Sequence, residues 1–226
     1  MMLGDAALAM WWDMAPDTRE EFEHWHSHEH FVERLALPGF QRASRWAEAT
    51  GGEGFFVLYE LLTYDALVSP EYQARLNAPS EWSREMMPHH RRMVRSQCRV
   101  VASRGGAVAG QVLTVRLSPA DGAQEALRIY LEALVQQLPA QPGVTGAHLL
   151  CTETPAIAST TEQRIRGNAD RAADWIFIAN GYDTLALQRL ADSGLSIPAL
   201  EGAGAARGAI VGTYALRSSM LAADTS

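Results

Sequence analysis

The chain has 226 residues, of which 47% are hydrophobic, and its formal net charge at pH 7 is −7. That length fits one large domain or two small ones, and the acidic balance argues against a nucleic-acid-binding surface. All 19 basic residues are arginines, which excludes a lysine Schiff base and a Walker A phosphate-binding loop.

The first half of the chain alternates between strand and helix patterns. Alternating apolar and aromatic residues predict strands, and a long amphipathic stretch that stops at Pro38-Gly39 predicts a helix. This order is that of a ferredoxin-like βαββαβ unit. The predicted elements are a strand at 5–14, a helix at 18–37, strands at 40–48 and 55–62, helical segments at 64–76 and 81–87, and a strand at 92–103.

The second half repeats the order. LPGF at 37–40 corresponds to QPGV at 141–144, an offset of 104 residues, and LLTYDAL at 61–67 corresponds to ANGYDTL at 179–185. We therefore predict two repeats, residues 1–105 and 106–226, with a polar insertion at 153–171 in the second. The predicted elements of this half are strands at 111–117, 143–152, 175–180 and 208–217, and helices at 120–138 and 183–193.

Two such repeats predict an α+β fold. Each would form a four-stranded antiparallel sheet with helices on one face, and the two bare faces would pack together into a pseudo-dimeric α+β barrel within one chain. The absence of an apolar run of about 18 residues predicts no membrane-spanning helix. The N-terminus lacks the early positive charge of a signal peptide, and Cys98 and Cys151 are expected to be free thiols, so we expect a cytoplasmic protein.

Four histidines alternate within EFEHWHSHEH at 21–30. At about 100° per residue, a helix separates them: His24 and His28 face water, whereas His26 lies on the apolar face and His30 at its edge. The far side also holds Phe31 and Leu35. The predicted apolar face further includes Phe22, Trp25, Glu29, Val32, Glu33 and Ala36.

Histidine and glutamate beside an apolar surface are candidates for proton transfer. We predict Glu29 or His26 as the base, His30 as the acid or as the group that orients Glu29, and Arg45 as a cation that steadies an enolate or carboxylate. The alternative is a structural pair of Glu29 with a histidine or an arginine, and aromatic residues that are simply core. The predicted substrate-binding residues are Trp12, Trp25, Glu33, Arg45, Trp46 and Tyr59.

We expect no metal and no cofactor. HSHEH at 26–30 formally matches the H-x-x-E-H zinc pattern, but five residues with three fixed positions arise easily in a histidine-rich segment. The alternatives are a divalent metal at His26 and His30 with a third ligand such as Glu33, His89 or His148, or a haem held by one histidine of the helix. The sequence contains no CxxCH for covalent haem attachment.

The second half lacks the polar residues of this helix. At an offset of 104, His26 corresponds to Tyr130, Glu29 to Ala133 and His30 to Leu134. A structural role common to both halves would have kept a polar pair in both. We therefore predict one working site, in the first half.

The run W-x-x-x-E-H-x-x-E-R-L-x-x-P-G-F, from Trp25 to Phe40, is followed by a strand with Arg42, Arg45 and Trp46 and then by FFVLYEL. Over residues 5–103 the chain resembles the EthD-like and related dimeric α+β barrel proteins. This superfamily includes muconolactone-type isomerases, polyketide cyclases, cofactor-independent monooxygenases and haem enzymes. The resemblance implies a pocket between helices and sheet.

Three functions therefore remain open. The first is an enzyme without organic cofactor that uses His/Glu acid–base catalysis for isomerisation, cyclisation or lyase chemistry on an apolar oxygenated or aromatic metabolite. The second is a cofactor-independent or haem-dependent monooxygenase, and the third a non-catalytic ligand-binding protein. We expect a small-molecule substrate, no nucleic acid or membrane partner, and either a monomer with an internal pseudo-dimer or a homodimer.

Overall fold

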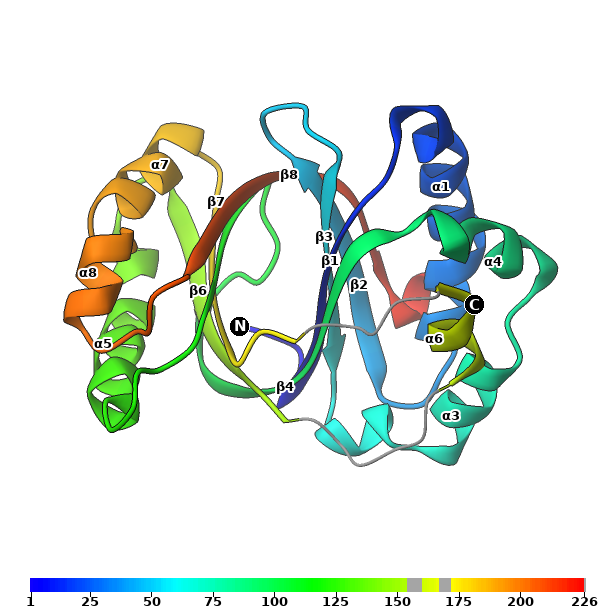
Figure 1. The fold of residues 1–226 in the computed structure, drawn as a ribbon, viewed down its shortest axis with the longest axis horizontal. Helices are drawn as coiled ribbons and strands as arrows, with labels where there is room; N and C mark the ends of the chain where they lie inside the picture. The colour runs from blue at the N-terminus through cyan, green and yellow to red at the C-terminus, as the bar shows by residue number, and fades with distance from the viewer. Residues whose placement is uncertain (154–159, 167–171, 226) are drawn as a thin grey trace.

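The computed structural model describes residues 1–153, 160–166 and 172–225. Over these residues the strands close into one antiparallel barrel in the order β1-β3-β2-β8-β5-β7-β6-β4, with helices on its two opposite sides (Figure 1). The predicted fold class is confirmed. The strands are β1 (Ala6–Asp13), β2 (Phe40–Glu48), β3 (Gly54–Leu61), β4 (Arg91–Gly105), β5 (Gln111–Leu117), β6 (Val144–Thr152), β7 (Trp175–Gly181) and β8 (Ile210–Leu221).

Each half of the chain contributes four adjacent strands in the same relative order. The first half forms β4-β1-β3-β2 and the second forms β8-β5-β7-β6. The two sheets are not only packed face to face: β2 pairs with β8, and β4 pairs with β6, both antiparallel. Because every sheet edge is paired with the other half, the barrel has no open edge.

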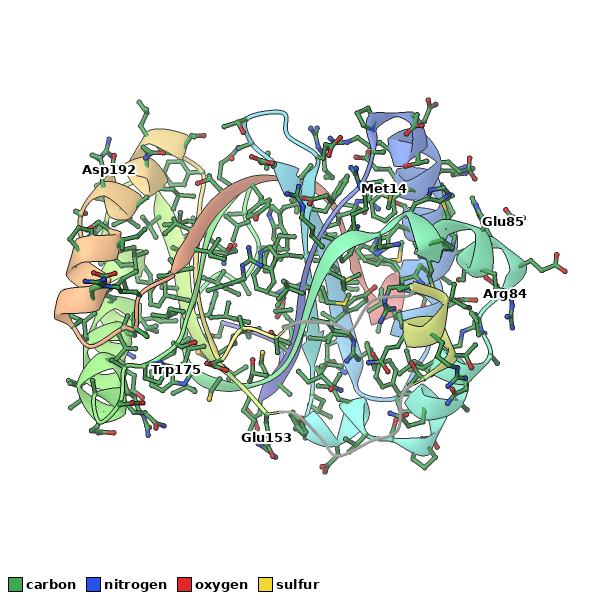
Figure 2. The ribbon with its side chains drawn as sticks, viewed as in Figure 1. Met14, Arg84, Glu85, Glu153, Trp175 and Asp192 are labelled. Atoms are coloured by element: carbon green, nitrogen blue, oxygen red, sulfur yellow. The ribbon has the colours of Figure 1, made fainter. Side chains whose placement is uncertain are left out.

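The helices lie outside the barrel, and side chains fill the space on both faces of the strands (Figure 2). None of the described helices is long and apolar enough to cross a membrane. The short α6 and α8 were not predicted, and parts of the predicted insertion, at 154–159 and 167–171, lie outside the described residues. The helices are α1 (Arg19–Trp25), α2 (Phe31–Leu35), α3 (Pro70–Asn77), α4 (Glu81–Met86), α5 (Gln124–Gln137), α6 (Thr161–Arg166), α7 (Thr184–Asp192) and α8 (Ile197–Gly202).

The two PG anchors end equivalent helices in the two halves. Gly39 and Gly143 have φ angles of 87° and 90°, a left-handed conformation that glycine adopts without strain. A Cβ at Gly39 would lie 2.8 Å from the Cβ of Ala66, and one at Gly143 would lie 2.4 Å from that of Ala186. Both glycines are therefore required by the backbone angle and by the close approach of the following segment.

The α6 segment of the second half lies on the first half. In Figure 1 this helix stands among the first-half helices α1, α3 and α4, and it contacts α3 and the 3₁₀ turn Met87–His89. Its Glu162 is buried. A residue from beyond position 153 therefore completes the helical layer that covers the first-half sheet.

A π-helical turn at His26–His30 interrupts the long first-half helix between α1 and α2. The N–H of Phe31 donates to the carbonyl of His26, five residues earlier. One extra residue in a turn rotates the following helix by about 100°. Phe31, Arg34 and Leu35 are therefore buried, whereas Val32 is only partly buried and Ala36 is exposed.

The predicted apolar face is thus wrong beyond the π turn. Val32 and Ala36 were expected to face the sheet, and Phe31 and Leu35 to lie on the far side. Up to His28 the helix agrees with expectation, since Phe22, Trp25 and His26 are buried and His24 and His28 are exposed. A constant angle per residue cannot anticipate a local change of helix type.

Deletion of His28 is expected to convert the π turn into regular α-helix. The buried residues of α1 and of α2 would then still face the sheet. The unfolding temperature, measured by circular dichroism, should stay the same or rise. The matched control is deletion of the exposed Ala133 in α5, a regular helix. That deletion rotates half of the apolar face away from the sheet and should lower the unfolding temperature by about 5 °C or more. Equal losses in the two variants would contradict this account of the turn.

Candidate functional site

A small cavity lies between the first-half helices and the outer face of their sheet. Its volume is about 40 Å³, which is room for about three water molecules. Strands β1 and β3, the π turn, α2, α3 and α6 all contribute to its wall. The polar and aromatic side chains that matter for its chemistry are Trp12, Trp25, His26, His30, Arg34, Tyr59, His90 and Glu162.

His26 and His30 both point from the π turn into this cavity, with ring centroids 5.2 Å apart. The Nδ1 atom of each ring is buried without a hydrogen-bond partner in the described part of the chain. Burial lowers the pKa of His26 well below its usual value, and the cations Arg45 and Arg34 and the nearby His90 add to this effect. Burial and Arg34 likewise lower the pKa of His30. Both imidazoles are therefore neutral at pH 7.

A third buried histidine, His90, lines the same cavity and was missed in the sequence. Its Nδ1–H donates to the carbonyl of Met87 at 3.1 Å, a bond that leaves Nε2 unprotonated in the neutral ring. Its ring lies 5.0 Å from that of Trp12, and burial followed by Arg166 lowers its pKa to about 3. Nothing in the sequence indicated its position, because only the fold brings the start of β4 against the π turn.

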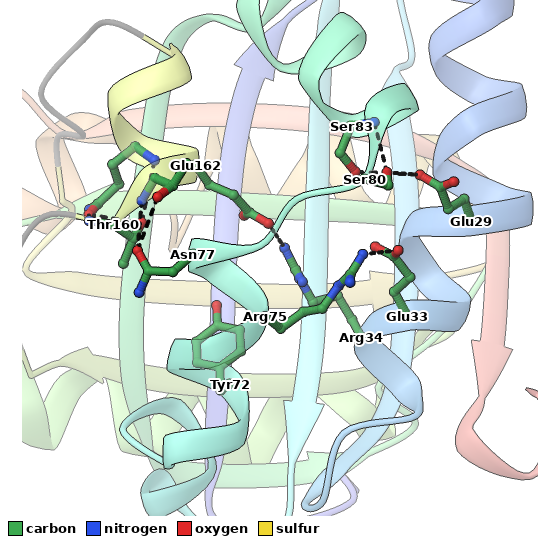
Figure 3. A network of polar contacts seen from close by, with 12 residues as sticks. Glu29, Glu33, Arg34, Tyr72, Arg75, Asn77, Ser80, Ser83, Thr160 and Glu162 are labelled. Carbon is green, nitrogen blue, oxygen red and sulfur yellow. Dashed lines mark hydrogen bonds and ion pairs between the residues drawn. The ribbon is translucent and has the colours of Figure 1, made fainter.

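Arg34 and Glu162 form a buried ion pair across the cavity, with 2.5 Å between NH2 and Oε1. Figure 3 shows the two side chains meeting from α2 and α6. Burial opposes the charge on Arg34, but Glu162 and the hydroxyls of Tyr72 and Tyr59 outweigh it and raise its pKa. Arg34 is therefore a fixed cation. Its NH1 atom and the Tyr59 hydroxyl are buried without a hydrogen-bond partner among the described residues.

Glu29 and Glu33 lie outside the cavity. Because the π turn changes the helix phase, Glu29 turns toward α4, where it accepts hydrogen bonds from Trp25 Nε1 at 3.1 Å and from Ser80 Oγ at 2.5 Å (Figure 3). Glu33 forms an ion pair with Arg75 of α3. Both carboxylates thus join the long helix to its neighbouring helices, and neither forms a hydrogen bond or ion pair with a described histidine of the site.

The remaining predicted residues lie partly in the cavity and partly outside it. Trp12, Trp25 and Tyr59 line the cavity. Arg45 lies behind it, where its guanidinium donates to Ser27 Oγ at 3.0 Å and stands over the Phe22 ring. Trp46 is in the barrel interior with its Nε1 bonded to Ala109 O at 3.2 Å. Because neighbouring residues of a strand point to opposite faces, Arg45 and Trp46 cannot line one pocket.

The burial pattern of α5 shows which residues replace the site in the second half. The offset of 104 holds after the π turn, where Arg34 corresponds to the buried Leu138. Before the turn the extra residue makes the offset 105, so that His26 corresponds to the fully buried Leu131 and not to the expected Tyr130. The second helical layer is thus apolar where the first carries histidine and arginine.

The described residues contain no group of three His, Cys, Asp or Glu side chains that could hold a metal ion. Glu33, His89 and His148, considered as third ligands, do not join His26 and His30. The cavity of about 40 Å³ is also much smaller than a porphyrin, so haem does not fit it in this conformation. We therefore derive no step through a metal or haem.

A larger hollow, of about 1040 Å³, lies at one end of the barrel. Its described lining contains no histidine and no buried carboxylate. The neutral imidazoles whose Nδ1 atoms lack a hydrogen-bond partner among the described residues line the smaller cavity instead.

Neither protein-family models nor curated protein sequences match this chain. Solved structures do match it. The fold is similar to that of an anthrone oxidase-like protein (TM-score 0.63, 12% identity, 100% of this chain and 97% of the other covered). It is also similar to a candidate monooxygenase from Fusobacterium nucleatum (TM-score 0.61, 9% identity, 97% of this chain and 96% of the other covered). A third similar structure is that of a major regulator of staphylococcal pathogenesis (TM-score 0.51, 8% identity, 93% of this chain and 98% of the other covered).

These similarities confirm the expected fold, a dimeric α+β barrel in tandem single-chain form. At such low identities they show the fold alone. The three matched proteins also carry different descriptions, so this fold by itself does not determine a function.

The buried histidines make stability depend on pH. Unfolding restores a pKa near 6.5 to His26, His30 and His90, whereas in the folded protein all three are lowered. The free energy of unfolding is therefore not reduced by these histidines above pH 6.5. It falls as the pH drops below 6.5, because the unfolded chain then binds more protons than the folded protein. Between pH 7 and pH 5 each should remove about 2 kcal/mol from the free energy of unfolding.

Urea unfolding at the two pH values measures this loss. His26→Leu, which copies Leu131 of the other half, should make the loss smaller by about 2 kcal/mol. His24→Ala, an exposed histidine of the same helix, should leave it unchanged. A loss that is the same in all three proteins would show that His26 is protonated in the folded state.

Proposed function

We propose that the helix–sheet cavity of the first half is the active site for oxidation of a small aromatic ketone or phenol by dioxygen, started by a neutral histidine that removes an acidic C–H proton. The observation that carries this proposal is that five buried polar atoms without a hydrogen-bond partner in the described part of the chain belong to side chains that line one cavity. They are Trp12 Nε1, His26 Nδ1, His30 Nδ1, Arg34 NH1 and Tyr59 OH.

Each buried polar atom without a partner destabilises the folded protein by about 1–3 kcal/mol. Native proteins rarely leave several such atoms in one place unless water or a ligand pairs with them. The equivalent layer of the second half, with Leu131 and Leu138, shows that the fold does not need them. A ligand that forms hydrogen bonds with these atoms would explain why the first half keeps them.

The groups present can carry out a proton abstraction. A neutral His26 or His30 accepts the proton, and the guanidinium of Arg34 and the hydroxyl of Tyr59 donate to the enolate or phenolate oxygen that forms. Because burial weakens both imidazoles as bases, the C–H group must itself be acidic. A ring methylene beside a carbonyl, whose anion spreads over aromatic rings, meets this requirement.

The oxidation balances without a cofactor. One dioxygen converts a methylene into a carbonyl and one water, so that one oxygen atom enters the product and the other leaves with the two hydrogens. Similarity to an anthrone oxidase-like protein and to a candidate monooxygenase supports this choice among the reactions that begin with a carbanion. Isomerisation, cyclisation and lyase chemistry can begin with the same step and stay predictions.

A ringed substrate is larger than the cavity, so binding requires part of the wall to move. The Arg34–Glu162 pair joins α2 to α6 directly across the cavity. Separation of this pair would free Arg34 for a substrate oxygen. Glu162→Gln keeps the shape of the side chain and weakens the pair, so we expect it to lower the KM for substrate more than it changes kcat.

Anthrone provides a direct test, with oxygen uptake and anthraquinone formation as readouts. The protein should accelerate both above the buffer rate, with one dioxygen consumed per anthrone. His26→Gln combined with His30→Gln should reduce the rate by about 100-fold, a usual contribution of a general base. His28→Gln, on the exposed side of the same turn, should retain it. The absence of any acceleration by the wild-type protein would refute oxidation of this substrate class.

Hydrogen exchange separates the first step from the oxygen step. Under anaerobic conditions in heavy water, the protein should speed deuterium entry at the anthrone methylene, and the double glutamine variant should not. Catalysed exchange without catalysed oxygen uptake would favour the isomerase or cyclase alternative at the same site.

A further inference from the structure

We propose that the open end of the barrel is a second binding site, for an aromatic anion: a planar ring system that carries one carboxylate or sulfonate. This barrel-mouth pocket has a volume of about 1040 Å³, just above the usual range of about 300–1,000 Å³ for small-molecule sites. It lies where β1 and β5 end and where β3, β4 and β8 begin. The residues on which the argument rests are Trp11, Asp13, Arg92, Arg116, Arg207 and Tyr214.

The barrel-mouth pocket differs from the helix–sheet cavity in the residues that carry its charge, which lie at the strand ends and on the inner face of the sheet, although Trp12 and Met93 line both hollows. Trp11 belongs to the barrel interior, whereas its neighbour Trp12 packs against Phe22 and His26 of the helical layer. Successive strand residues alternate between faces. No histidine is among the described lining of the barrel-mouth pocket, so a ligand held by Trp11 and Arg116 need not displace the buried histidines, and this proposal does not depend on the proposed oxidation.

Arginine side chains dominate the charge of the pocket. Asp13, the acid of its lining, is already paired with Arg92 at the rim. Neither Arg116 nor Arg207 forms an ion pair with any described residue. In a chain with a net charge of −7, the described lining therefore carries an excess of two positive charges, which attracts an anion.

Arg116 is the cation placed to bind the anionic group. It is half-buried, and its guanidinium carbon lies 4.9 Å from the centre of the Trp11 ring. Burial lowers its pKa, with Tyr214 and Asp13 opposing the change. A guanidinium on an aromatic face keeps its N–H groups in a plane that matches a carboxylate or sulfonate.

An unpaired donor lies directly beneath that cation. Trp11 is 3% exposed, and its Nε1 is buried without a hydrogen-bond partner in the described part of the chain. Its ring stacks on Phe56 at 4.8 Å, and Phe56 in turn stacks on Trp46 at 5.4 Å and contacts Tyr214. This aromatic floor suits a flat apolar body, and the donor and the cation together suit its acidic group.

The rim is shaped by an irregularity in the sheet. The β1–β4 register shifts between Trp11 and Asp13, and Arg92 opposite has a φ of 54°, the one positive φ outside glycine in the described residues. A bulge re-aims the side chains around it and is frequent beside binding sites. Here it brings Arg92 to Asp13, which neutralises the carboxylate that would otherwise repel an anion.

Fluorescence titration with two dyes tests the proposal. Anilinonaphthalene sulfonate carries the charge, and N-phenylnaphthylamine has the same ring system without it. We expect saturable binding of the sulfonate at one site, and an affinity about tenfold or more above that of the neutral dye. Arg116→Gln should remove that advantage without changing the affinity for the neutral dye. Trp11→Phe, which keeps the ring and removes the donor, should weaken the sulfonate about threefold to tenfold.

Controls separate this site from other binding. Arg128→Gln, an exposed arginine on α5, should leave both affinities unchanged, and His26→Leu should leave sulfonate binding unchanged while it impairs the proposed oxidation. Equal affinities for the two dyes, or a sulfonate affinity insensitive to both Arg116→Gln and Trp11→Phe, would mean adventitious dye binding only and would overturn the proposal. Loss of binding in His26→Leu alone would place the dye in the helix–sheet cavity and would overturn it as well.

Discussion

One extra residue in the first long helix is the constraint on which the candidate active site depends. The π turn at His26–His30 keeps the helix continuous, with His26 and His30 facing the sheet, and it rotates α2 so that Arg34 is also buried. A regular helix would have directed Glu29 inward and Arg34 away. The π turn, closed by the i→i+5 hydrogen bond from Phe31 N–H to the His26 carbonyl, therefore selects which polar groups reach the cavity.

The two helical layers of the barrel differ in polarity. The second helical layer is apolar, with Leu131 and Leu138 where the first has His26 and Arg34. Burying neutral imidazoles and an arginine destabilises the first layer, because their hydrogen-bonding atoms lose water without gaining partners. The Arg34–Glu162 pair offsets part of that loss, and it does so with a carboxylate supplied by the second half of the chain.

Closure of the barrel gives each strand of the first half two chemically different faces. The outer face lies under the helices and carries Trp12 and Tyr59 toward the histidines, whereas the inner face carries Trp11 and Trp46 into the barrel interior. Two hollows result, one small and lined by neutral imidazoles, the other wide and lined by arginines, and Trp12 and Met93 border both. Alternation along one strand thus places adjacent residues in two different hollows.

Local signals in the amino-acid sequence were sufficient to predict the strands, the long helices, their duplication and the burial of His26 and His30, because hydrophobic periodicity and Pro-Gly stops act over a few residues. The remaining features depend on tertiary packing. The π turn reflects packing of the whole helix against the sheet, and it moved Glu29 out of the site. His90 and Glu162 lie 60 and 132 residues after His30 in the chain, and no local pattern shows that folding brings such distant side chains to one cavity.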